Sequence, residues 1–449
     1  MDKKTMMEKL AREAYEKGAF TGVWLYAEHG EIVSKGAVGF RDAADTLPVT
    51  EDSVFNLASI SKQFTAAAIL LLRRRGLLDL EDEITRFYPE MPYKGVTIRH
   101  LLSHTGGLPG FEGWAKKTVK EENCVPKHGI ILRFLRESGA PPAFASGEQY
   151  AYGNTGYCLL SELVQLLSGL PFGDFLKREI FEPAGMTSTR LGRPTEGEDK
   201  RGALACGLVL DDGSYVPPED AAFDYMVPLF DRLQGCSNVY SNVFDLLAWD
   251  RTLREGCVLT EEEQRLMATP VILSSGQLVR DEDSGECCGL GWSIADDPAL
   301  GRSVGHDGNW DGYSGWYERF LDADRVLTFL CCRFPIDVRA FSGFWDGMKA
   351  VARDRAPEPV RALEDLASKD ADPSGWEALC GTYERDGSRI EVSMSENALY
   401  AAVRYENGYG YTSRLLPLGE KSFGLKVDMG ELCFEPDGLR FWGQTYRKL

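Results

Sequence analysis

Two residues with complementary chemistry, Ser59 and Lys62, lie three positions apart in the stretch 55–65. A serine hydroxyl becomes a nucleophile when a neighbouring group takes its proton. A lysine can do so as a neutral amine, and burial readily removes the charge of a lysine. Residues at i and i+3 share one face of a helix. The pair therefore indicates a nucleophile and its base, with an ordinary surface helix turn as the alternative for an isolated Ser-x-x-Lys.

The element that must position this pair is the apolar run 66–72, which ends at three arginines and Gly76. Ala, Leu and Gln favour helix, arginines suit the C-terminal end of a helix dipole, and glycine is a common stop. A lysine at the start of an otherwise apolar helix does not fit a solvated face. Ser59 is thus predicted at or near the first turn of a buried helix. Unpartnered amides of that turn point towards the reacting centre.

Two later clusters carry further candidate residues. Tyr152 and Asn154 lie on a glycine-punctuated turn before the helical run 158–170, where polar side chains can project into a cleft. The alternative for these two is a helix N-cap and a packed tyrosine. His306, Gly308 and Asn309 lie in 304–316, a stretch dense in glycine and aromatic residues. Glycines let a substrate backbone approach an edge strand, so this stretch is interpreted as a binding wall.

Metal and redox chemistry are not expected. His100 and His104 have the i, i+4 spacing of a metal pair, but no third ligand accompanies them, and structural hydrogen bonds are the expectation. The adjacent cysteines at 287–288 and 331–332 would point to opposite faces of a strand, so no shared redox role is expected. No cofactor is predicted.

The bulk composition narrows the class of protein. A length of 449 residues predicts two domains. The net charge of −19 argues against nucleic acid and anionic membrane as partners. Eleven scattered cysteines fit reduced thiols better than a disulfide framework. With neither a signal peptide nor a membrane-spanning run evident, a cytoplasmic enzyme acting on a small molecule or short peptide is expected. The oligomeric state is left open.

The remaining pattern predicts how the chain is organised. Residues 22–27 and 32–38 alternate around a turn at 28–31 and predict a hairpin. The composition of residues 195–230 predicts a long loop excursion at the edge of the site. Residues 242–254 are predicted to form a helix. A linker is expected at 355–374, between a domain of 1–354 and a small β-domain of 375–449. Short strands are predicted in this last part at 389–394, 399–403, 414–416, 423–427, 431–434 and 439–444.

The order Ser59-x-x-Lys62, Tyr152-Gly153-Asn154 and His306-Asp307-Gly308 resembles the serine β-lactamase and penicillin-binding-protein superfamily. The likeness is greatest to the class C branch, which also holds esterases and D-aminopeptidases. The sequence segments at residues 55–58, 101–108 and 181–186 match as well. The likeness covers roughly residues 5–350. It implies an α+β, three-layer fold whose antiparallel sheet is flanked by helices. The C-terminal part is similar to the lipocalin-like β-barrels attached to some relatives.

The resemblance also implies roles for the candidate residues. Ser59 would be the acylated nucleophile, and Lys62 and Tyr152 would share the proton transfers. Asn154 would contact the substrate amide or orient Lys62. The amides of Ser59 and Asn309 would form an oxyanion hole, in which one donor contributes roughly 3–4 kcal/mol.

The third motif departs from the pattern of the β-lactamases, because His306 replaces their lysine. A histidine is only partly charged near neutral pH, so a substrate carboxylate would be held less firmly. The expected activity is therefore cleavage of an ester or a D-amino-acid amide or peptide through an acyl-enzyme, ahead of β-lactam hydrolysis. A non-catalytic binding or sensing module and an acyltransferase are the alternatives.

Overall fold

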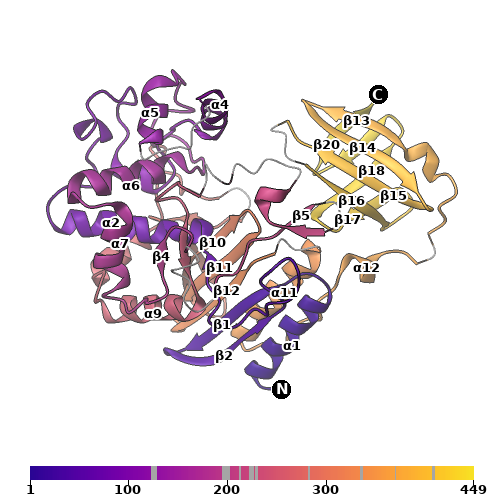
Figure 1. The fold of residues 1–449 in the computed structure, drawn as a ribbon, viewed down its shortest axis with the longest axis horizontal. Helices are drawn as coiled ribbons and strands as arrows, with labels where there is room; N and C mark the ends of the chain where they lie inside the picture. The colour runs from indigo at the N-terminus through magenta and orange to yellow at the C-terminus, as the bar shows by residue number, and fades with distance from the viewer. Residues whose placement is uncertain are drawn as a thin grey trace.

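The protein is described from a computed structural model, which covers residues 1–122, 129–194, 203–211, 214–221, 227, 231–281, 284–333, 337–369, 371–406 and 410–449. In Figure 1 a central sheet lies between α2, α6 and α9 on one side and α1 and α11 on the other, with a separate barrel beside them. Much of the excursion predicted at 195–230 lies outside the described residues.

The central sheet has seven strands in the order β2-β1-β12-β11-β10-β9-β8, and every neighbouring pair is antiparallel. Side chains alternate between its faces. On β1, Trp24 and Tyr26 belong to one apolar cluster, whereas Val23 and Leu25 belong to the other. The strands are β1 (Gly22–Glu28), β2 (Glu31–Val38), β8 (Cys287–Cys288), β9 (Ser293–Asp297), β10 (Gly301–Trp310), β11 (Tyr313–Phe320) and β12 (Arg325–Cys331). The predicted hairpin is confirmed as β1 and β2.

Helices cover both faces of this sheet. Helices α1 and α11 pack on one face, and the stacked rings of Phe20 and Phe344 (centroids 4.3 Å apart) lie in that cluster. The other face carries the larger core. The helices are α1 (Lys3–Glu16), α2 (Lys62–Arg74), α3 (Ile98–Leu102), α4 (Glu112–Glu122), α5 (Ile130–Glu137), α6 (Thr155–Ser168), α7 (Phe172–Leu176), α9 (Val243–Glu255), α10 (Glu261–Met267), α11 (Val338–Ala352) and α12 (Leu363–Leu366). The helix predicted at 242–254 is confirmed as α9.

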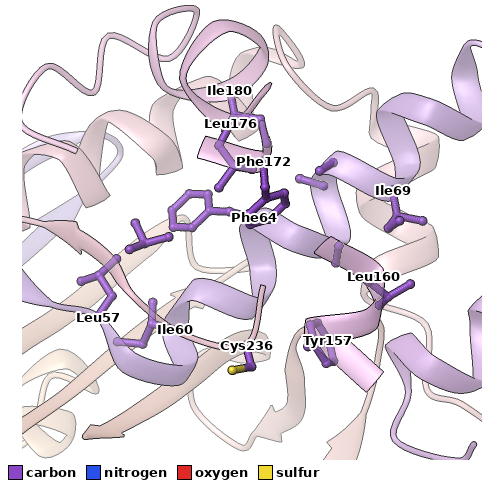
Figure 2. Close-up of a cluster of buried hydrophobic side chains, with 14 of the residues drawn as sticks. Leu57, Ile60, Phe64, Ile69, Tyr157, Leu160, Phe172, Leu176, Ile180 and Cys236 are labelled. Atoms are coloured by element: carbon purple, nitrogen blue, oxygen red, sulfur yellow. The ribbon is translucent and has the colours of Figure 1, made fainter. Parts of the chain in front are cut away.

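Helix α2 forms the centre of the larger core. Every residue from Lys62 to Leu72 is buried, so the helix is enclosed on all sides. Figure 2 shows Phe64 directed towards Phe172, Leu176 and Ile180. The Phe64 ring also lies 5.2 Å from that of Trp249. Burying a ring of this size stabilises the fold by roughly 1.5–3 kcal/mol. Gly76 follows the helix with φ +72°, as its predicted role as a stop requires.

Short elements connect the larger ones along the chain. A three-stranded sheet has the order β3-β7-β4, and β5 pairs with β6. These strands are β3 (Phe55–Asn56), β4 (Arg190–Leu191), β5 (Val209–Asp211), β6 (Ser214–Val216) and β7 (Val239–Ser241). Single helical turns are η1 (Ala58–Ser61), η2 (Ile84–Arg86), η3 (Lys177–Phe181), η4 (Pro218–Asp220) and η5 (Trp376–Leu379).

The C-terminal part is a closed eight-stranded antiparallel barrel. Its strands are β13 (Gly381–Arg385), β14 (Ser388–Ser395), β15 (Ala398–Arg404), β16 (Gly410–Pro417), β17 (Ser422–Leu425), β18 (Asp428–Glu435), β19 (Gly438–Phe441) and β20 (Gln444–Lys448). The first five expected strands correspond to β14–β18, whereas β13 and β20 were not predicted. The range 439–444 was wrong as one strand, because Trp442 and Gly443 turn the chain between β19 and β20 with positive φ.

Apolar side chains, including Leu399, Phe423 and Leu432, fill the barrel interior. The barrel docks on α11, where the backbone N–H of Val338 donates to the carbonyl of Lys426 (2.9 Å). The predicted α+β fold with a small β-barrel is confirmed, and the domain boundaries at 354 and 375 stay a prediction.

No single helix in the described parts of the chain has the length and apolar character to cross a membrane. By length and composition alone, one bent pair, Thr155–Ser168 and Phe172–Phe181, passes that test.

Candidate active site

Ser59 lies on the turn η1, between β3 and α2. The residue before it, Ala58, has φ +46°, a left-handed conformation that costs a residue with a side chain about 1 kcal/mol or more. The backbone N–H of Ala58 donates to the side-chain oxygen of Asn56 (2.8 Å), which holds this conformation. Lys62 is the first residue of α2, so the predicted helix start is a 3-10 turn followed by the α-helix.

This nucleophile turn is fixed to the segment before β7. The backbone N–H of Leu57 donates to the carbonyl of Val239 (2.8 Å). In return, the N–H of Val239 donates to the hydroxyl of Ser61 (3.1 Å). The amide of Asn56 also donates to the side-chain oxygen of Asn238 (3.0 Å). The three bonds join two parts of the chain that are far apart in sequence.

The Lys62 side chain is fully buried and surrounded by acceptors. Its Nζ donates to Ser59 Oγ (2.9 Å), to Asn154 Oδ1 (3.1 Å) and to the carbonyl of Cys236 (3.0 Å). An ammonium has three N–H donors and no acceptor, so three acceptors match its charged form.

The expectation of a neutral Lys62 is therefore wrong for this arrangement. Burial alone would lower the pKa of Lys62, but the negative charge that Tyr152 and Cys236 carry when ionised outweighs burial and raises it. The sequence showed the burial of this lysine but not the acceptors around it.

Tyr152 and Asn154 both reach the Ser59–Lys62 pair from the turn before α6. The Tyr152 hydroxyl donates to Ser59 Oγ (2.8 Å). Asn154 occupies the N-cap position of α6, but its side chain makes no capping bond and instead accepts from Lys62. A missing cap costs a helix about 1 kcal/mol. The Asn154 side chain thus binds Lys62, and α6 loses the stabilisation of an N-cap hydrogen bond.

His104 also belongs to this centre, although its sequence context gave no sign of it. Its ring lies 4.4 Å from the Tyr152 ring and 5.1 Å from the Tyr157 ring. Its Nδ1 accepts from the backbone N–H of Gly153 (3.3 Å). Burial, reinforced by the charges of Lys62 and His306, holds the pKa of His104 well below its usual range. A neutral His104 therefore packs behind Tyr152 and fixes its ring.

Strand β10 forms the opposite wall, as predicted. The His306 ring is 6.2 Å from the Tyr152 ring, and its Nδ1 lies 2.6 Å from the carbonyl of Asp307. A carbonyl only accepts, so Nδ1 carries the proton and Nε2 of neutral His306 is an acceptor. The side chain of Asn309 is turned towards Asp307 and Ser314.

Gly308 allows β10 to approach the nucleophile turn. A Cβ at this position would lie 2.3 Å from the carbonyl oxygen of Leu57. Strand β9 pairs with β10 only as far as Gly305. The edge of β10 from His306 to Trp310 therefore lines the cavity beside Ser59.

The cavity next to Ser59 has a volume of about 500 Å³. Three carboxylates line it, from Asp281, Glu286 and Asp307, and none of the described lining residues is Lys or Arg. Burial, followed by the charge of Glu318, raises the pKa of Glu286. The cavity wall is thus acidic, a property that the scattered positions of these residues did not reveal.

No group of three or more His, Cys, Asp and Glu in the described ranges is arranged to hold a metal ion. His100 instead caps α3: its Nδ1 accepts from the backbone N–H of Thr97 (3.2 Å).

The comparisons with known proteins agree with this geometry. The beta-lactamase family model matches residues 7–345. The chain is 34% identical over 436 residues to a penicillin-binding protein of Bacillus subtilis (strain 168), covering 96% of this chain and 94% of that protein. The structure of the octameric penicillin-binding protein homologue from Pyrococcus abyssi matches with a TM-score of 0.67 and 22% identity, over 100% of this chain and 99% of that chain.

A D-amino acid amidase from Ochrobactrum anthropi SV3, solved with L-phenylalanine amide, matches with a TM-score of 0.62 and 20% identity, over 79% of this chain and 97% of that chain. The chain belongs to the beta-lactamase family, and its class is that of the hydrolases of this family. The expected resemblance is confirmed.

Proposed function

We propose that this protein is a serine hydrolase that cleaves an ester or amide bond through a covalent acyl-enzyme on Ser59. One observation carries the proposal: Ser59 Oγ accepts hydrogen bonds from both Lys62 Nζ (2.9 Å) and the Tyr152 hydroxyl (2.8 Å). A serine oxygen at the mouth of a cavity, within hydrogen-bond distance of a tyrosine oxygen that can act as its base and of a lysine, has the arrangement of an activated nucleophile.

The charged state of Lys62 divides the proton work between the two partners. Lys62 Nζ lies 4.8 Å from the centre of the Tyr152 ring, so its charge acts on the negative charge that moves between the Tyr152 and Ser59 oxygens during the reaction. In its ionised form Tyr152 accepts the proton of Ser59 as Oγ attacks the carbonyl carbon. Tyr152 then returns that proton to the leaving alcohol or amine. Lys62 holds Ser59 Oγ in place, and its charge stabilises the negative charge as it moves.

The oxyanion that forms would be bound by backbone N–H groups. We assign this role to the amides of Ser59 and Asn309, since Gly308 brings β10 against the turn that carries Ser59. Water then attacks the acyl-enzyme, with Tyr152 as the base.

The charge of the cavity favours one substrate class. Asp281, Glu286 and Asp307 would repel a carboxylate-bearing β-lactam and attract a substrate with an ammonium group. With Nδ1–H donated to the carbonyl of Asp307, Nε2 of the uncharged His306 ring is an acceptor that suits an N–H donor. Both features support small esters and amides, D-amino-acid amides among them, ahead of β-lactams.

The experiment is a hydrolysis screen over p-nitrophenyl acetate, D-amino-acid p-nitroanilides and nitrocefin, combined with intact-mass analysis after fluorophosphonate treatment. We expect turnover of the ester or anilide and one added label on Ser59. A chain that takes up no label and turns over nothing would be a non-catalytic binding module. Product that appears only with an added alcohol or amine acceptor would identify an acyltransferase.

A further inference from the structure

Two thiols lie directly behind Lys62, and the proposed reaction uses neither. Cys158 of α6 and Cys236 have their Sγ atoms 3.3 Å apart, and each is 2% exposed. The two backbones also approach closely here. Gly235 precedes Cys236, and Tyr157 precedes Cys158. A Cβ on Gly235 would lie 2.2 Å from the carbonyl oxygen of Tyr157.

The pair is chemically asymmetric. The thiol of Cys158 donates to Cys236 Sγ, and this bond lowers the pKa of Cys236, with help from Lys62 and against the effect of burial. The same bond, together with burial, raises the pKa of Cys158 well above its usual value. Thiolates are the reactive form of cysteine. Cys236 is one of the residues that line the cavity beside Ser59, and this cavity is the route that the proposal gives to a small oxidant.

We propose that Cys158 and Cys236 are a redox modification site: a hydroperoxide converts them to a disulfide that switches the catalytic centre off, and a thiol reductant reverses it. The Cys236 thiolate attacks the peroxide, the O–O bond breaks, and Cys236 becomes a sulfenic acid. The departing alkoxide or hydroxide takes up the proton that the Cys236 thiol released on ionising and leaves as an alcohol or water. The Cys158 sulfur then attacks that sulfur and expels the hydroxyl group, which takes the Cys158 proton and leaves as water. The two thiols together supply the two electrons that reduce the peroxide.

The bond would act through the two groups that hold Lys62. The carbonyl of Cys236 accepts from Lys62, and Asn154, whose side chain also accepts from Lys62, bonds through its carbonyl to the N–H of Cys158 (3.0 Å). A disulfide brings the sulfurs to about 2.0 Å, so the segments move together by up to about 1 Å. A displacement of that size in a catalytic constellation can cost about 100-fold in rate.

Cys288 is the matched comparison, because its thiol lines the same cavity. Burial raises the pKa of Cys288 to about 11, and its side chain contacts Tyr150. Peroxide entering the cavity therefore meets both thiols, but only Cys236 has a second thiol in contact with it among the described residues.

The test treats the reduced full chain with a few equivalents of hydrogen peroxide. Peptide mapping should find one linked peptide that joins Cys158 to Cys236. Turnover of p-nitrophenyl acetate, and the rate of fluorophosphonate labelling of Ser59, should fall at least tenfold and recover with dithiothreitol. Cys158→Ala and Cys158→Ser should form no link and lose the reversible inhibition, whereas Cys288→Ala should respond like the wild type.

Absence of the linked peptide would overturn the proposal, as would a linked protein that keeps the rate of the reduced one. Equal reversible inhibition of Cys158→Ala and wild type would also refute it. The switching effect rests on the proposed hydrolase function, but the bond itself does not. A chain without turnover or labelling would remove the hydrolase proposal, while the peptide map would still decide the disulfide.

Discussion

Gly308 of β10 packs against the carbonyl group of Leu57, so that a Cβ on Gly308 would lie 2.3 Å from the Leu57 oxygen. Leu57 begins the turn that carries Ser59, and Gly308 follows the histidine of the opposite wall. This one contact therefore sets the distance between the nucleophile and the strand along which a substrate would lie.

Gly308→Ala should force the strand and the turn apart. We expect a loss of about 1–3 kcal/mol in the free energy of unfolding, the usual cost of overpacking, together with a large loss of turnover. Urea denaturation and ester hydrolysis measure the two effects. Gly113→Ala is the control, because nothing lies within 4 Å of its added methyl. A stable and fully active Gly308→Ala protein would show that this contact does not set the site.

Ser59→Ala should abolish acylation and turnover and leave the fold intact, since it removes a single oxygen. Intact mass after fluorophosphonate treatment should show no added label. Ser293→Ala, which changes another serine lining the cavity, should label normally. Substantial residual turnover by Ser59→Ala would contradict the assignment of the nucleophile.

Lys62→Ala and Tyr152→Phe should each lower kcat by about 10²–10⁴-fold, the usual range for a proton-transfer group. Their combined effect should fall short of the product, because both act on one oxygen. Tyr150→Phe is the matched control, since its hydroxyl bonds to Asp281 and not to Ser59. Wild-type rates for Tyr152→Phe would return Tyr152 to a packing role.

His306→Lys should shift specificity towards substrates that carry a carboxylate. A lysine places a full positive charge beside the acidic wall, and a tenfold change in the ratio of kcat/KM values corresponds to about 1.4 kcal/mol. The ratio for nitrocefin against p-nitrophenyl acetate measures the shift at several pH values. His29→Lys adds the same charge far from the cavity and should leave the ratio unchanged. A wild type that prefers nitrocefin throughout would make the protein a β-lactamase despite its histidine.

Asp311→Asn should change how stability depends on pH. Burial, with the charge of Asp231, raises the pKa of Asp311 to about 7, and its Oδ2 has no hydrogen-bond partner among the described residues. The pKa of this carboxyl is higher in the folded protein than in the unfolded chain, where it is ~3.9. The protonated carboxyl therefore contributes its full stability to the fold below pH ~3.9, and this stability is lost as the pH rises towards 7.

Asp311→Asn should therefore match the wild type near pH 4 and exceed it near pH 8 by up to roughly 4 kcal/mol, since the pKa is raised from 3.8 to about 7 and one pKa unit corresponds to about 1.4 kcal/mol. Thermal or urea unfolding at several pH values measures this. Asp52→Asn, at an exposed position, should keep the wild-type pH profile. An unchanged profile for Asp311→Asn would contradict the prediction.

The sequence was sufficient for the parts of the site that depend on local spacing. Ser59 and Lys62 are three residues apart, and Tyr152 and Asn154 share one turn, so each pair meets through local geometry alone. The hairpin and most barrel strands likewise follow from alternation and turn residues. The placement of all three motifs around one cavity came from the resemblance.

The features of the site that the sequence did not predict depend on contacts between residues that are distant along the chain. The Cys236 carbonyl that accepts from Lys62 lies 174 positions further along the chain, and the thiols of Cys158 and Cys236 are 78 positions apart. A backbone carbonyl has no sequence signature, and isolated Cys, Asp or Glu residues show no pattern. The charged state of Lys62 was mispredicted for this reason, because its pKa is set by these distant neighbours and not by burial alone.

The pairing of β1 with β12 also has a consequence for the order in which the protein forms. Gly22 of β1 pairs with Cys331 of β12, and α1 packs against α11. A ribosome adds roughly 5–20 residues per second, so β1 is synthesised about 15–60 s before its partner strand. Six of its seven residues are buried in the finished sheet. During synthesis this apolar strand must remain open on one edge, which makes the nascent N-terminal hairpin a natural client for a chaperone.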